Sequence, residues 1–450
     1  MLPIAETNSM QASQTTVTPA ELDAIWTKIT WRIMPIVLIA YVMAFLDRIN
    51  VGYAKLTMQQ DLQFSDEVYG LGAGIFFLTY LIFEVPSNLW MERVGARRTL
   101  LRIMVLWGIA STATAWVTTP TQFYLVRLLL GAFEAGFFPG IILYLTYWYP
   151  SARRGRVTGW FMFGMPITGV LGGPLSGWIL KSFDGVGGWH GWQWVFVIEG
   201  IPTILIGVLV YLLLTDKPEQ ARWLNDREKS IVHQAMQVDR QGEDPQESHG
   251  GLRGLKLALG DSMTWVLAFI YFTCTSAVYT LTFWLPTMVK SLGIADIAQV
   301  GWYTAIPFAF GSLGILALSR SSDYFRERRW HVASTLIIGS IALYATTLTA
   351  GAFFPSMVLL CVAAFFIFGC ALFWSIPPTY LSRQAAATGI AVISSLGTLG
   401  GFVSPTLIGA FKTSTGSIST GLFAMMALIC AGGLTLLLIV PKTAVRVGRN

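Results

Sequence analysis

The chain has 450 residues, of which 54% are hydrophobic and only 12% are charged, whereas soluble domains have about 25% charged residues. Apolar stretches long enough to cross a bilayer, about 20 residues each, recur along the whole sequence. This composition excludes an ordinary soluble enzyme and predicts an all-α polytopic membrane protein. The net charge of +6 is concentrated in a few short loops, which indicates membrane orientation and argues against nucleic-acid binding.

The N-terminal segment is polar and is followed by a helix signal. Residues 1–17 lack the basic and apolar regions of a cleaved signal peptide. Thr18-Pro19-Ala20-Glu21 has the spacing of a capping box and predicts a helix that leads into the first membrane span. We therefore assign residues 1–32 to a cytoplasmic tail with an amphipathic helix.

Two groups of six spans are expected on either side of a long hydrophilic segment. Residues 33–214 contain the first six spans, and residues 264–440 contain the last six. Between them, residues 215–263 form a cytoplasmic central loop, in which the capping-box spacing of Asn225 and Glu228 predicts a short helix. Residues 441–450 form a second cytoplasmic tail.

Arginine clusters set the expected orientation. They are Arg93, Arg97, Arg98 and Arg102 after the second span, Arg153, Arg154 and Arg156 after the fourth, and Arg320, Arg326, Arg328 and Arg329 after the eighth. Basic loops remain on the cytoplasmic side of a membrane. We expect a multi-pass protein of the cell inner (plasma) membrane, in contact with its lipids, with both termini and the central loop in the cytoplasm.

The two groups of spans show signs of duplication. Residues 91–98 can be set against residues 322–329, a spacing of 231 residues, and the same spacing sets Pro174 against Pro405. Two six-helix halves related by an axis along the membrane normal place a substrate cavity between them, near the middle of the bilayer.

Four ionisable residues lie within otherwise apolar spans: Asp47, Arg48, Arg127 and Glu134. A charge at this depth costs at least about 2.5 kcal/mol, so such groups are paired, face water or bind a substrate or proton. Arg127 and Glu134 are seven residues apart in an expected span over 121–146. This spacing puts them on one helix face, about 10.5 Å apart along the axis, too far for direct contact.

The residue types suggest an anion and a proton as ligands. A guanidinium remains charged and can hold both oxygens of a carboxylate, so Arg48 and Arg127 are candidate substrate ligands. A carboxyl group suits proton coupling because its protonation responds to burial and to nearby arginine, so Asp47 and Glu134 are candidate proton carriers. We expect two acid–base pairs on facing helices, Asp47 with Arg48 and Arg127 with Glu134. The alternative for all four is an internal ion-pair network that only holds helices together.

Neutral groups complete the predicted site. Tyr80, Tyr279 and Thr398 are the additional substrate ligands that we favour. Glu84 lies close to an arginine-rich loop, which favours a structural ion pair or a helix cap, and Glu199 has no evident role. The sequence contains no Walker loop, no nucleophile–base pair and no metal-ligand spacing among its histidines and cysteines. We therefore expect no enzyme activity, cofactor or metal, and the proton gradient as the energy source.

Several motifs resemble the anion:cation symporter branch of the major facilitator superfamily, which includes tartrate, phthalate, hydroxyphenylacetate and sugar-acid permeases. These motifs are Leu46-Asp47-Arg48-Ile49-Asn50, Phe83-Glu84-Val85-Pro86-Ser87-Asn88, Glu92-Arg93-x-Gly95-x-Arg97-Arg98, Gly131-Ala132-Phe133-Glu134-Ala135-Gly136-Phe137-Phe138-Pro139-Gly140 and Phe373-Trp374-Ser375-Ile376-Pro377. The resemblance implies a fold of two six-helix halves. It also implies that acidic residues of the first and fourth spans carry protons and that arginines there hold the substrate anion.

Together these observations predict a monomeric, proton-coupled symporter that takes up a small organic anion, a carboxylate, by alternating access. A proton-independent exchanger or uniporter is the alternative, and a non-transporting membrane sensor is another. Relatives often have Asn where this chain has Ser394 and Thr398, and Gly164-Met165-Pro166 replaces a polar position of some sugar-acid carriers. These departures argue against a highly hydroxylated ligand but leave aromatic acids, dicarboxylates and sugar acids open.

Overall fold

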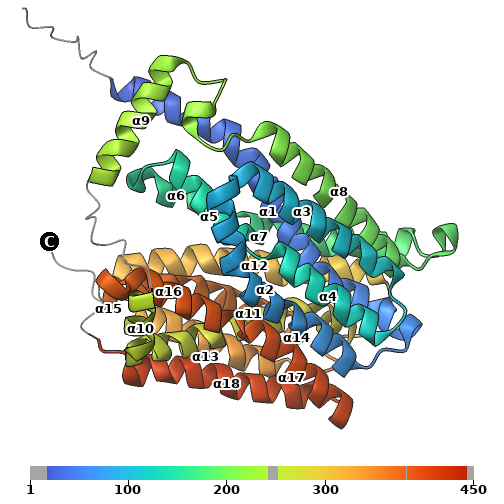
Figure 1. Cartoon of the computed structure of the whole chain (residues 1–450). Coiled ribbons are helices and arrows are strands. Elements are labelled where there is room, and N and C mark those ends of the chain that lie inside the picture. Colours follow the sequence, from blue (N-terminus) through green and yellow to red (C-terminus); the bar gives the residue numbers. More distant parts are fainter. Residues whose placement is uncertain (1–17, 242–251, 382, 443–450) are drawn as a thin grey trace, which may run out of the picture.

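The computed structural model describes residues 18–241, 252–381 and 383–442, and these residues form helices and no strand. Figure 1 shows two groups of helices packed side by side, one coloured blue to green and the other yellow to red. Each group corresponds to one half of the sequence, as the duplication predicts.

The first half contains six spans built from eight α-helices, because the fourth and fifth spans are each interrupted. The helices are α1 (Pro19–Leu62), α2 (Asp66–Val94), α3 (Ala96–Ala113), η1 (Thr114–Trp116), α4 (Pro120–Glu134), α5 (Phe137–Trp148), α6 (Ser151–Met162), α7 (Gly164–Ser182), η2 (Val186–Gly188) and α8 (Gly191–Leu213). Thr18 caps α1 as expected, since its Oγ1 accepts a hydrogen bond of 3.2 Å from the Glu21 amide. The boundary expected at residue 32 lies inside this one continuous helix.

The second half repeats the arrangement. Its helices are α11 (Ser262–Lys290), α12 (Ile297–Phe325), α13 (Arg329–Ala345), α14 (Phe353–Phe368), η5 (Gly369–Ser375), α15 (Pro377–Tyr380), α16 (Arg383–Thr398), α17 (Gly400–Thr415) and α18 (Ile418–Ile439). Within the described residues, 11 helical segments are long and apolar enough to cross a membrane, and α13, with 17 residues, completes the twelve.

The central segment contacts both halves: its first part packs against the first half, and its last helix packs against α16 and α11 of the second. Its helices are η3 (Pro218–Gln220), α9 (Asp226–Gln241) and α10 (Leu252–Gly260). The predicted capping box is confirmed, because Asn225 and Glu228 exchange two backbone-to-side-chain hydrogen bonds of 2.8 Å. Lys28 of α1 forms an ion pair with Glu228 at 2.8 Å. Asp239 accepts hydrogen bonds from Ser151 at the start of α6, and the Ser151 hydroxyl holds the pKa of Asp239 below its usual range. The segment 242–251 and most of the two predicted tails, residues 1–17 and 443–450, lie outside the described residues.

The duplication is visible in the helix bounds and in the contacts between the halves. Helices α2 and α12 each have 29 residues, and both of their bounds are 231 positions apart. In α2, a Cβ added at Gly70 would lie 2.3 Å from the Pro405 carbonyl of α17. In α12, a Cβ added at Gly301 would lie 2.2 Å from the Gly173 carbonyl of α7. Gly70 and Gly301 are also 231 positions apart, so the close packing between the halves occurs twice in equivalent places.

Two ion pairs close the same end of the molecule. Lys181 of α7 contacts Asp296, which caps α12, at 2.7 Å, and Lys412 of α17 contacts Asp66 of α2 at 3.1 Å. Lys181 and Lys412 again differ by 231 positions. We call these two ion pairs and the two glycine contacts the outer seal, because they lie at the helix ends opposite to the arginine-rich loops, the side that the sequence predicts to face away from the cytoplasm.

Candidate functional site

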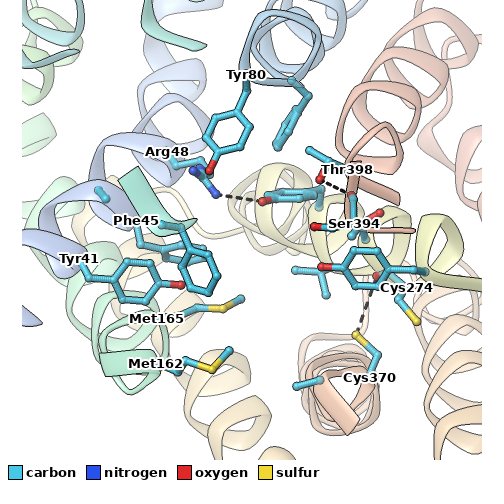
Figure 2. A pocket seen from close by; sticks show the side chains of 18 of the residues that line it. Tyr41, Phe45, Arg48, Tyr80, Met162, Met165, Cys274, Cys370, Ser394 and Thr398 are labelled. Carbon is cyan, nitrogen blue, oxygen red and sulfur yellow. Dashed lines mark hydrogen bonds between the residues drawn. The ribbon is translucent and has the colours of Figure 1, made fainter. Parts of the chain in front are cut away.

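A cavity of about 270 Å³ lies between the two halves. Helices α1, α2, α4, α5, α6 and α7 contribute residues from the first half, and α11, α12, α14, η5 and α16 contribute residues from the second. Figure 2 shows Arg48 and Tyr80 together at one end of the cavity, with Met162 and Cys370 at the opposite end. Tyr41 and Phe45 lie on the wall of the first half, whereas Ser394 and Cys274 lie on the wall of the second.

Interrupted helices surround this cavity. Between α4 and α5 the chain turns at Ala135 and Gly136, and Gly136 has a φ of 87°, which favours glycine. A Cβ at Gly136 would also lie 2.5 Å from the Ser87 side chain. Further interruptions occur at Phe163, in the 3₁₀ helix η5, and at Leu399. Irregular backbone within a membrane is tolerated where it is buried in protein or lines a cavity, so these interruptions mark the position of the site.

Arg48 is the centre of the polar end. Its Nη2 forms an ion pair with Oε1 of Glu134, the last residue of α4. Its Nη1 donates a hydrogen bond of 3.1 Å to the Tyr279 hydroxyl of α11, which is on the other half. The guanidinium carbon lies 5.5 Å from the centre of the Tyr80 ring. Four of the predicted site residues therefore meet at one point, and four helices, α1, α2 and α4 of the first half and α11 of the second, converge there.

Two polar atoms at this point remain free. Arg48 Nε and Glu134 Oε2 are buried and have no hydrogen-bond partner among the described residues. Thr398 lines the same cavity, and its hydroxyl donates to the Ser394 carbonyl at 2.8 Å. A ligand oxygen that reached Arg48 Nε would therefore break no existing hydrogen bond at that atom.

Asp47 lies elsewhere, and the expected Asp47–Arg48 pair is wrong. Its side chain is buried away from the cavity, because adjacent positions of a helix point in different directions. The carboxylate accepts hydrogen bonds from Trp107 at 2.7 Å, Ser111 at 2.7 Å and Thr203 at 2.8 Å. These partners come from α3 and α8, so Asp47 connects three helices inside the first half.

Arg127 also lies outside the cavity, and it makes no ion pair with Glu134, as the spacing of the two residues along the helix predicts. Its Nε donates to the Gly72 carbonyl of α2 at 3.2 Å, and its guanidinium lies 5.6 Å from the centre of the Phe76 ring. The side chain is 1% exposed. The physical reason is depth: Arg127 is almost two helical turns from Glu134, toward the outer seal, where α4 packs directly on α2. In this conformation the Arg127 side chain does not line the cavity.

Sequence reasoning missed much of the cavity wall. The wall includes Tyr41, Phe45, Met162, Met165, Tyr271 and Cys370. Apolar residues inside an apolar span give no signal that separates a cavity wall from helix packing, so only tertiary structure identifies them. Glu84 lines the cavity as well. It lies inside α2 and forms no ion pair with any described residue, so neither the structural ion pair nor the helix cap that we expected is present. Glu199 is buried in α8, where Ser176 donates to it at 2.7 Å.

Comparison with known families decides what kind of protein this is. The model of the Major Facilitator Superfamily matches residues 37–405. The chain belongs to the Major Facilitator Superfamily. It is therefore a multi-pass membrane transporter of a small molecule and not an enzyme, in agreement with the fold and with the cavity between its halves.

Individual relatives of this transporter are similar over nearly its whole length. "Putative metabolite transport protein NicT" of Pseudomonas putida is 44% identical, covering 92% of this chain and 95% of the relative. "Putative tartrate transporter" of Agrobacterium vitis is 43% identical, covering 92% and 90%. The crystal structure of a D-xylose-proton symporter has the same fold, with a TM-score of 0.71 at 16% identity over 92% of this chain and 98% of that one.

Proposed function

We propose that this transporter is a proton-coupled symporter that imports a small organic anion across the inner membrane, with its termini in the cytoplasm. The observation that carries the proposal is the ion pair between Arg48 and Glu134 at the wall of the central cavity. A relative of 43% identity is named for tartrate, which is a carboxylate, and this supports an anionic substrate.

The ion pair supplies a physical coupling between proton and anion. When Glu134 is ionised, it neutralises Arg48 and competes with any other carboxylate for that guanidinium. When Glu134 binds a proton, its attraction for Arg48 falls, and the substrate carboxylate takes its place with the two-pronged geometry that guanidinium groups favour. Substrate and proton are therefore bound together, as symport requires.

Tyr279 connects the binding of proton and substrate at Glu134 and Arg48 to the other half of the molecule. It is the hydrogen-bond partner of Arg48 from α11, so a change at Arg48 alters a contact between the halves. We assign Tyr80, Tyr279 and Thr398 to the substrate site with Arg48. Asp47 is a second candidate proton carrier, and its contacts with α3 and α8 would transmit a change of charge within the first half.

Uptake into proteoliposomes under an imposed pH gradient tests the proposal. Arg48→Lys loses the planar fork of the guanidinium and is expected to reduce uptake by at least tenfold. Glu134→Gln is expected to abolish the response to the pH gradient while preserving exchange of substrate for substrate. Arg32→Lys and Glu67→Gln are matched controls at exposed positions and should behave like the unmodified protein.

The same assay separates the rival functions. Uptake that ignores both the gradient and Glu134→Gln would show an exchanger or uniporter and would refute proton coupling. Binding without any flux would indicate a sensor. If Glu134→Gln abolishes binding itself, Glu134 is a ligand or a structural residue and not a proton carrier.

A further inference from the structure

The charge distribution in the cavity limits the number of anionic groups on its ligand. Arg48 is the only basic side chain among the described residues that line the cavity. The lining also includes two acids, Glu84 and Glu134, and Glu84 has no cationic partner among the described residues. A second carboxylate on the ligand would lie in a cavity without a second cation and close to an acidic side chain. These charges favour a monocarboxylate over a dicarboxylate.

The two threonine hydroxyls of the wall are already bonded to helix backbone. The Thr275 hydroxyl donates to the Gly397 carbonyl, and the Thr398 hydroxyl donates to the Ser394 carbonyl. No Asn, Gln, His or Lys is present among the described lining residues. The remaining hydroxyls belong to Ser394 and to tyrosines whose rings form the apolar wall. The several hydroxyls of a sugar acid or tartrate would exchange many water partners for these few groups, and buried polar groups without partners are costly.

Rings and sulfur atoms form the rest of the wall, on both halves. Tyr41 is held by Phe161, with ring centres 4.4 Å apart. On the other half, the Tyr271 ring lies 4.5 Å from that of Trp374. Met165 lines the cavity beside Tyr41 and Phe45, and thioether sulfur contacts aromatic rings favourably. A ring in this cavity would thus be contacted by aromatic groups of both halves.

We propose that the cavity selects a single-ring aromatic monocarboxylate, with the carboxylate at Arg48 and the ring between Tyr41 and Trp374. This inference rests on the proposed function, because it identifies the substrate class of the same site. The volume of about 270 Å³ is just below the range of pockets that hold drug-sized ligands, which suits one ring. The choice differs from the hydroxylated dicarboxylate named for one of the relatives.

Isothermal titration calorimetry of the purified full chain with benzoate, L-tartrate and D-gluconate tests the substrate class. We expect benzoate to bind at least tenfold more tightly than either hydroxylated acid. Trp374→Ala should weaken benzoate binding by at least tenfold, and Trp374→Phe, which keeps a ring, should restore it to within about threefold. Trp302→Ala, at a residue of α12 that is 66% exposed, is the matched control and should leave benzoate binding unchanged.

The outcomes separate this inference from the proposed function. Tighter binding of tartrate or gluconate, with uptake driven by the pH gradient, would overturn the aromatic substrate and leave symport intact. Benzoate binding that depends on Trp374, without gradient-driven uptake, would support the aromatic site and refute symport. If none of the three acids binds, or if Trp374→Ala leaves benzoate affinity unchanged in a folded protein, the inference is wrong.

Discussion

The guanidinium of Arg48 contacts a carboxylate, a phenol and two aromatic rings within one small region. The Arg48 side chain is 17% exposed and that of Glu134 is 1% exposed, so most of the surrounding water is excluded. Removing one partner of a buried ion pair leaves an uncompensated charge and costs about 3–5 kcal/mol. Removing both partners costs less, since no buried charge remains.

This asymmetry predicts the result of a double-mutant cycle. Arg48→Met should lower the apparent melting temperature of the detergent-purified protein strongly, because ionised Glu134 is left without its cation. Adding Glu134→Gln should recover part of the loss, with a coupling of more than about 1 kcal/mol. The exposed pair of Arg227 and Glu21, at 2.9 Å, serves as a control and should couple by less than about 1 kcal/mol. Additive effects of Arg48→Met and Glu134→Gln would contradict the ion pair.

Among the structural elements, the interruption between α4 and α5 determines where Glu134 points. An uninterrupted helix would continue in the same direction past Glu134. In the structure α4 ends at Glu134, and a new helix, α5, begins at Phe137. Gly136 makes this possible with its positive φ. The site therefore depends on a backbone conformation as much as on the charged side chains.

Gly136→Ala tests this dependence. A side chain at a positive φ costs about 1–3 kcal/mol, and the contact with Ser87 adds to it, so the apparent melting temperature and transport should both fall. Gly155→Ala is the matched control, because Gly155 lies within α6 with no atom within 4 Å of the added Cβ, and alanine favours a helix. Equal melting temperatures for the two variants would contradict the prediction, because they would show that a side chain at position 136 causes no backbone strain.

At the scale of the whole molecule, the two equivalent ion pairs of the outer seal differ in burial. Lys181 and Asp296 are 58% and 30% exposed, and exposed pairs contribute about 0–1 kcal/mol. Asp66 instead contacts two lysines, Lys412 and Lys55, and Lys55 is only 1% exposed. The two halves thus have similarly placed ion pairs of unequal burial, in which the lysines are 231 positions apart and the aspartates 230.

Asp66→Asn is therefore expected to open the outer end, whereas Asp296→Asn should have little effect. Spin labels at the outer ends of α2 and α17 would report the opening by double electron–electron resonance, as an increase in the population with longer distances. We expect at least a tenfold change in the ratio of open to closed molecules for Asp66→Asn, which corresponds to about 1.4 kcal/mol. Equal responses of the two variants would show that burial of Lys55 does not strengthen this contact.

The sequence by itself determined the features that depend on local or periodic patterns. Apolar runs of bilayer length determine the twelve spans, and the capping boxes at Thr18 and Asn225 begin α1 and α9. The 231-residue spacing predicts the two halves. Arg48, Glu134, Tyr80 and Tyr279 were identified because charged and polar groups are rare in apolar spans.

Tertiary structure alone decided which of these groups meet. Arg48 pairs with Glu134 across 86 positions of the chain and with Tyr279 across 231, while Asp47 and Arg127 are buried against other helices. Such pairings depend on helix interruptions and on packing between the halves. Local sequence patterns do not reveal either of these features. The aromatic and sulfur wall of the cavity is likewise indistinguishable in sequence from ordinary helix packing, because the same apolar residues serve both.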